Sequence, residues 1–146
     1  KVANFTSTDE PFVVGKAQKL VDGNDVTILA CGHLVWKALI AQEQLEAEGI
    51  SAEVINIHTI KPLDDEAILA SAAKTGCVVT AEEHNFLGGL GESVARVLSL
   101  NNPTPQEFVA VNDSFGESGT PDQLLEKYGL NETAIVAAAK KAISRK

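Results

Sequence analysis

The chain has 146 residues, with 12 basic and 20 acidic side chains and a formal net charge of −8 at pH 7. That length suits one domain, and the 45% share of hydrophobic residues is typical of a globular protein with a buried core. The acidic balance excludes binding to a phosphate backbone, which needs a basic surface. Because no apolar run approaches the roughly 20 residues that cross a bilayer, we expect neither nucleic acid nor a membrane as a partner.

The two cysteines, Cys31 and Cys77, are too few for a disulfide framework and stand in no Cys-x-x-Cys pair. We interpret both as buried free thiols in a reducing compartment, which predicts a cytoplasmic protein. The sequence has no methionine, not even at position 1. This absence favours a piece of a larger protein or a processed product.

In the first half of the chain, a polar segment leads into alternating strand and helix patterns. Residues 1–11 have no periodic pattern and are expected to be a connecting segment, so that one domain spans residues 12–146. A first strand-like region ends at a turn over residues 22–25, and residues 26–31 form a continuous apolar strand of the buried parallel type. A helix over about residues 34–48 follows. Its apolar row is Leu34, Ala38, Ala41 and Leu45, with Gly49 placed to end it.

The second half repeats the alternation and carries clear helix-start signals. Strands are predicted over residues 52–57, 77–81 and 108–111, and helices from the acidic turn at 64–66 and from about residue 91. Thr120, Pro121 and Gln123 have the spacing of a helix N-terminus, and Asn131 can cap the last helix. Strand–helix alternation with short connections predicts an α/β fold in three layers, with helices on both faces of one sheet.

Histidines and acidic residues gather where the predicted strands end. His33, His58 and His84 each follow a strand, and Glu82 and Glu83 precede the last of them. Such an edge can bind metal or hold an acid–base pair. The residues lack metal-ligand spacing, however, and polar side chains belong at the ends of buried strands in any case. Gly-x-Ser-x-Gly is absent too. We therefore predict neither a metal site nor a catalytic residue.

Two further features each have a functional and a structural interpretation. Gly88, Gly89 and Gly91 open a helix after a strand, where backbone N–H groups can hold an anion. Close helix–sheet packing also explains the glycines. We favour this interpretation, because neither Gly-x-Gly-x-x-Gly nor a P-loop is present. Trp36 and Ile40 lie one turn apart, outside the apolar row of their helix. They mark either a partner surface or a wider core.

Four segments together resemble one family, the C-terminal domain of transketolase and its thiamine-diphosphate-dependent relatives. The segments are residues 25–32, residues 57–64, residues 79–92, and residues 118–125 before Tyr128-Gly129-Leu130. They occur in the family's order, and the resemblance covers about residues 11–145. It also accounts for the missing methionine, since this domain normally follows two others or forms part of a second subunit.

The resemblance implies a five-stranded mixed, mostly parallel sheet whose first strand runs antiparallel to the other four. It also implies that the N-terminal and middle domains, or a separate partner subunit, hold thiamine diphosphate and Mg²⁺, and that this chain binds neither. What remains for this domain is packing in a homodimer, support of the catalytic domains and the rim of the substrate channel. The resemblance places Glu83, His84 and the turn of Gly88, Gly89 and Gly91 nearest a functional edge.

Within the family, Glu83-His84 followed by the double glycine resembles transketolase more than deoxyxylulose-phosphate synthase or the β subunit of a 2-oxoacid dehydrogenase. This branch transfers a two-carbon ketol unit between sugar phosphates, as in the pentose phosphate pathway, and we expect the isolated chain to be inactive. Residues 113–117 lack the basic side chains of some transketolases, which argues against a phosphate clamp there. A stand-alone anion- or nucleotide-binding module and a pure oligomerisation module are the alternatives from other classes.

Overall fold

The computed structural model describes residue 6 and residues 11–146, so most of the expected connecting segment lies outside the described residues. Five strands form one sheet in the order β1-β3-β2-β4-β5. Strand β1 runs antiparallel to β3, and the other neighbouring strands are parallel. The strands are β1 (Gln18–Val21), β2 (Val26–Ala30), β3 (Ala52–Asn56), β4 (Val78–Asn85) and β5 (Gln106–Val111). The expected mixed, mostly parallel sheet is therefore confirmed.

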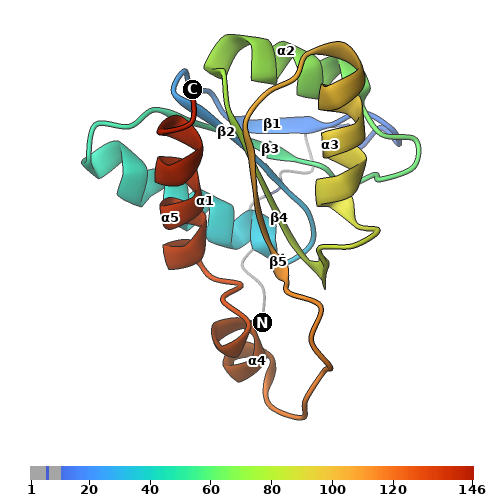
Figure 1. Ribbon diagram of the computed structural model, residues 1–146, viewed down its shortest axis with the longest axis vertical. Coiled ribbons are helices and arrows are strands. Elements are labelled where there is room, and N and C mark those ends of the chain that lie inside the picture. Colours follow the sequence, from blue (N-terminus) through green and yellow to red (C-terminus); the bar gives the residue numbers. More distant parts are fainter. Residues whose placement is uncertain (1–5, 7–10) are drawn as a thin grey trace.

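Helices cover both faces of the sheet, as the alternating pattern predicts. The helices are α1 (Leu34–Ala47), α2 (Asp65–Thr75), α3 (Leu90–Asn101), α4 (Pro121–Lys127) and α5 (Glu132–Ile143). Helices α1 and α5 pack on one face, α2 and α3 pack on the other, and α4 lies beyond the end of the sheet (Figure 1). In the described part of the chain, every helix is too short or too polar to cross a membrane.

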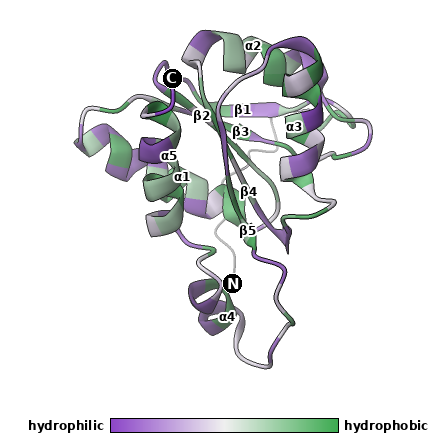
Figure 2. Cartoon of the chain, in the orientation of Figure 1, coloured by the Kyte–Doolittle hydropathy of each residue, from purple (hydrophilic) through white to green (hydrophobic). Residues whose placement is uncertain are grey.

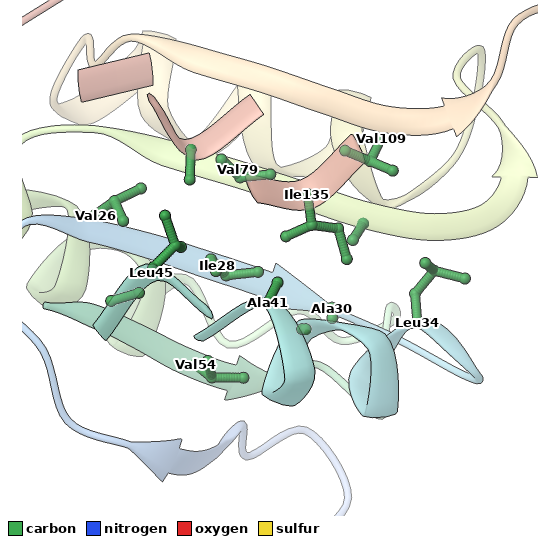
Figure 3. Close-up of a cluster of buried hydrophobic side chains, with 14 of the residues drawn as sticks. Val26, Ile28, Ala30, Leu34, Ala41, Leu45, Val54, Val79, Val109 and Ile135 are labelled. Carbon is green, nitrogen blue, oxygen red and sulfur yellow. The ribbon is translucent and has the colours of Figure 1, made fainter. Parts of the chain in front are cut away.

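The hydrophobic core consists of two clusters separated by the sheet. Strand β2 is buried along its whole length because it lies in the middle of the sheet. Its alternating side chains supply both clusters: Ile28 faces α1 and α5, whereas Leu29 faces α2 and α3. Figure 3 shows Ile135 of α5 beside Val79 and above Ile28 in the first cluster. Figure 2 shows hydrophobic residues along the central strands and hydrophilic residues on outer parts of α1 and α3.

The helix ends follow the sequence signals, with one shift. Thr120 and Gln123 form a capping box at α4, and the Asn131 side chain accepts a 2.9 Å hydrogen bond from the Ala134 N–H at α5. Asp64, expected in the first turn of α2, lies one position before it and accepts the Ala67 N–H as the N-cap. Its other carboxylate oxygen accepts the Ala17 N–H at 2.8 Å, so one carboxylate joins α2 to the residue before β1.

Two expectations need correction. Strand β4 does not end at Ala81 but continues to Asn85, because its pairing with β5 resumes at Val111 after an irregularity. Glu82, Glu83 and His84 therefore lie on the strand itself, with side chains directed alternately to its two faces. Cys31 is only partly buried, since it lies at the open end of β2, whereas Cys77 is buried as expected; both thiols are free.

Candidate functional site

The carboxyl ends of β2 and β4 bring together two residues that are distant in sequence. His33 Nδ1 lies 2.8 Å from Glu83 Oε1, and the His33 backbone N–H donates to Glu83 Oε2 at 3.1 Å. Gly32 permits this approach because its φ is +59° and an added Cβ would lie 2.9 Å from the same carboxylate. The result is a half-exposed histidine–carboxylate pair at the edge of the sheet, where α/β domains place their ligand sites.

The other two histidines lie apart from this pair. His84 is exposed, and its Nδ1 lies 2.9 Å from the Asn85 carbonyl oxygen. His58 stacks on Phe12, with ring centroids 4.2 Å apart, and lines a separate hollow of about 430 Å³ beside β1. Within residues 11–146 no three histidine, cysteine, aspartate or glutamate side chains come together as metal ligands.

The glycine turn before α3 already holds two carboxylates of the chain itself. The Leu90 N–H donates to Glu82 Oε2, and the Gly88 N–H donates to Glu92 Oε2 at 2.8 Å. Gly88 has a φ of +79°, and Gly89 is the N-cap of α3. These are the positions where N–H groups at a helix N-terminus bind an anion. Here the chain itself supplies the anionic groups, which are the Glu82 carboxylate from β4 and the Glu92 carboxylate from the first turn of α3.

Close packing requires two of these glycines to lack a side chain. An added Cβ on Gly89 would overlap the Glu82 carboxylate, and one on Gly91 would overlap the Phe108 ring. Glu82 is only 2% exposed, burial raises its pKa, and its Oε1 has no hydrogen-bond partner in the described part of the chain. The geometry thus agrees with the packing interpretation of Gly89 and Gly91.

A hollow of about 350 Å³ lies between the histidine–carboxylate pair and α4. Its walls are mainly apolar, with the His33–Glu83 pair at one side. The residues lining it are His33, Glu83, Val111, Gly119, Pro121, Leu124, Leu125, Tyr128 and Leu130. Sequence patterns did not reveal this hollow, because it depends on how α4 folds back toward the ends of β2 and β4.

Trp36 and Ile40 lie at the margin of the core rather than within it. Val35 and Gln42 widen the buried face of α1 beyond the expected row, but neither Trp36 nor Ile40 joins it. Trp36 is 37% exposed and Ile40 is half-buried. The side chains are therefore available to a partner, and the partner surface stays a prediction.

Fold and edge geometry together define a three-layer α/β domain whose sheet has one antiparallel edge strand. The family model for the transketolase C-terminal domain matches residues 15–135. The chain belongs to this family, which confirms the resemblance seen in the four sequence segments. The family is in general thiamine-diphosphate-dependent.

Among curated relatives, a 6-deoxy-6-sulfo-D-fructose transketolase subunit from Clostridium sp. is 51% identical over 140 residues, covering 96% of this chain and 44% of that protein. An apulose-4-phosphate transketolase subunit from Phocaeicola vulgatus is 39% identical over 135 residues, covering 92% of this chain and 43% of that protein. A 1-deoxy-D-xylulose-5-phosphate synthase from Syntrophotalea carbinolica is 37% identical, covering 90% of this chain and 21% of that protein. The chain thus spans less than half the length of these relatives.

A solved structure shows the same fold. It is described as a split gene transketolase in an inactive beta4 tetramer, and it matches with a TM-score of 0.94 at 51% identity. The match covers 98% of this chain and 47% of that one. Strand order, helix layers and chain course therefore correspond over nearly the whole domain.

Proposed function

We propose that the chain is the C-terminal, non-cofactor-binding domain of a transketolase that transfers a two-carbon ketol unit between sugar phosphates. The observation that carries this proposal is the family match over residues 15–135, together with relatives that are themselves transketolase subunits. Two free thiols suit a reducing, cytoplasmic setting. The domain would contribute by assembling with the N-terminal and middle transketolase domains or with a separate partner subunit.

Thiamine diphosphate and Mg²⁺ would be bound outside this domain. Glu82 and Glu92 occupy the N–H groups at the N-terminus of α3, so a diphosphate would meet two carboxylates there instead of free donors. The carboxylates at the N-terminus of α3 support this part of the proposal, because they leave no free donors there for a diphosphate. The same arrangement weighs against the stand-alone nucleotide-binding alternative, which calorimetry with ATP and with inorganic phosphate would test directly.

The decisive experiment is a ketol-transfer assay on the chain alone and mixed with its complementary transketolase polypeptide, with cofactor and Mg²⁺ present. Xylulose 5-phosphate and ribose 5-phosphate serve as the first substrates, and 6-deoxy-6-sulfofructose and apulose 4-phosphate test the activities named for relatives. Activity in the mixture only is the expected result. Formation of 1-deoxy-D-xylulose 5-phosphate instead would assign the chain to the synthase branch.

The rim of the substrate channel would include Glu83, His84 and the turn of Gly88, Gly89 and Gly91. Support comes from their place at the carboxyl end of β4 and from the exposed His33–Glu83 pair. In the reconstituted enzyme, His84→Ala is expected to raise KM for the sugar phosphate while complex formation stays unchanged. His58→Ala is the control, because His58 lines the hollow beside β1, apart from His84. Equal kinetics in both variants would remove His84 from the rim.

Assembly as a homodimer would use Trp36 and Ile40 on the exposed margin of α1. Light scattering is expected to show that Trp36→Asp and Ile40→Asp halve the mass of the assembled protein. Leu100→Asp, on the exposed side of α3, is the matched control and should leave the mass unchanged. An unchanged mass in both α1 variants would exclude this interface.

A further inference from the structure

Residues 112–128, which we call the edge arm, project from the carboxyl end of β5. The arm consists of a loop and α4, and it extends past the rest of the domain (Figure 1). No residue of α4 is fully buried, whereas each of the other four described helices has several buried residues. Leu125 and Tyr128 pack partly buried against the first core cluster, whereas the loop of the edge arm, residues 112–120, is exposed throughout.

The edge arm is held in place by specific contacts. Asp113, with a φ of 40°, accepts a 2.9 Å hydrogen bond from the Asn85 side-chain amide at the end of β4. The Tyr128 hydroxyl donates to the Phe115 carbonyl at 3.1 Å, and Lys127 pairs with Glu117 at 2.5 Å. These contacts join the loop both to α4 and to the neighbouring strand.

The tip displays a large apolar side chain. Phe115 is 98% exposed, which is the highest value among the exposed large hydrophobic residues of the described chain. Leu87 is 48% exposed and lies two residues after Asn85, the residue that anchors the arm. An exposed phenyl ring on a hydrogen-bonded loop suits the role of an interface anchor, because aromatic side chains supply much of the binding energy at interfaces.

The charge of the edge arm specifies the kind of pocket that would receive it. The arm carries four carboxylates, on Asp113, Glu117, Asp122 and Glu126, against one basic side chain, Lys127. Lys127 is already paired with Glu117. A complementary surface would therefore place an apolar pocket for the ring inside a rim of lysine and arginine.

We propose that the edge arm is a docking element whose Phe115 ring inserts into a basic-rimmed apolar pocket on the polypeptide portion that completes the transketolase. The inference rests on the proposed function. It commits to that partner because the chain spans less than half the length of its relatives, two of which are named as subunits. Phe115 is the anchor, and the carboxylates set the orientation of docking.

The test measures the dissociation constant of the complex with the complementary transketolase polypeptide by calorimetry. Phe115→Asp is expected to weaken binding by at least about 30-fold, as loss of an interface anchor does, and Phe115→Leu by roughly 3- to 10-fold. Leu100→Asp is the control, because Leu100 is 73% exposed on a different face. Raising NaCl from 50 to 500 mM should weaken the wild-type complex, and Asp122→Asn with Glu126→Gln should reduce that salt dependence.

The outcomes separate the inference from the proposed function. Phe115 packs on nothing in the described chain that its loss would unfold, and circular dichroism verifies that each variant is folded. Equal affinity of Phe115→Asp and wild type would overturn the docking role while leaving the transketolase assignment intact. Failure of the wild-type chain to bind would overturn both. A change in the mass of the isolated chain on Phe115→Asp would assign the edge arm to a second copy and overturn the chosen partner.

Discussion

Gly91 lies directly against the ring of Phe108, so that the backbone of α3 packs on a side chain of β5. A Cβ on Gly91 would overlap Phe108 and would lie 3.1 Å from Thr80 Oγ1. The Gln106 side chain closes the same contact, donating to the Gly91 carbonyl at 2.9 Å and to Thr80 Oγ1 at 3.2 Å. The position of the glycine turn relative to the sheet therefore depends on this contact.

Gly91→Ala is expected to destabilise the domain by about 1–3 kcal/mol, the usual cost of overpacking a well-filled site. Urea unfolding measures the loss. Adding Phe108→Leu should recover part of it, because the smaller side chain leaves room for the new methyl group. The matched control is Gly116→Ala, since nothing lies within 4 Å of a Cβ there. Equal stability of Gly91→Ala and wild type would contradict the packing interpretation.

Glu53 forms a buried ion pair that should make Lys74 important for stability. Glu53 is 2% exposed and accepts hydrogen bonds from Ser71 Oγ at 2.5 Å and from Lys74 Nζ. Lys74→Met leaves the buried Glu53 carboxylate with Lys19, at 3.6 Å, as its one remaining basic partner among the described residues. The free energy of unfolding, measured with urea, should fall by about 2–4 kcal/mol.

Two variants control the Lys74 result. Glu53→Gln combined with Lys74→Met should recover most of the loss, because the amide oxygen still accepts from Ser71 and no charge stays buried. Lys127→Met breaks a pair whose members are 51% and 59% exposed, and it should cost less than about 1 kcal/mol. Equal losses for the two lysine variants would show that burial of Glu53 is unimportant.

Glu82 should make stability depend on pH in the direction opposite to that of an ordinary ion-paired carboxylate. Burial raises its pKa above the usual 4.5, so the folded state binds the proton more tightly than the unfolded state. Its stabilising contribution is therefore complete below pH 4.5 and is lost as pH rises through the folded pKa. Measured by urea unfolding, the stability of wild type relative to Glu82→Gln should fall as the pH rises above 4.5. A difference that grows with pH would contradict this.

Cys31 should react slowly with alkylating reagents. Burial, followed by the charges of Glu82 and Glu83, raises its pKa to about 11. At pH 8 its thiolate fraction is then roughly two hundredfold lower than that of a thiol with the ordinary pKa of about 8.5. Iodoacetamide labelling followed by peptide mapping should show a rate that rises roughly 90-fold between pH 8 and 10, whereas a thiol of ordinary pKa rises only about fourfold. Glu83→Gln should accelerate the labelling, and a rate that levels off by about pH 9.5 would refute the raised pKa.

The periodic and capping signals of the sequence predict the three-layer α/β fold, whereas the antiparallel first strand of the mixed sheet follows from the family resemblance and not from these signals. Continuous apolar runs indicated buried strands, and Thr120 and Asn131 marked helix starts that the structure contains. The predicted end of β4 at Ala81 is wrong, because the polar residues that follow belong to the strand, which continues to Asn85. Glu82 can stay on a buried strand since the N-terminus of α3 supplies N–H donors to it.

The candidate site was less predictable, because its contacts join residues far apart in the chain. His33 and Glu83 are 50 positions apart, and only the adjacency of β2 and β4 brings them together. The full exposure of Phe115 also has no local signal, since an apolar residue in a loop is as often covered as exposed. Knowledge of the strand order would be enough to predict the His33–Glu83 pair. Predicting the exposure of Phe115 also requires the fold of the edge arm.

The strand order also determines how this sheet can begin to form. Strand β1 does not pair with β2, its neighbour along the chain, but with β3, which follows α1 in the sequence. Every other strand pair in the described chain likewise encloses a helix. No hairpin is available as a local starting point, so loop closure across a helix must come before the first sheet hydrogen bonds. Folding should therefore start with helices, and the sheet should assemble around β2 once α1 has brought β3 beside it.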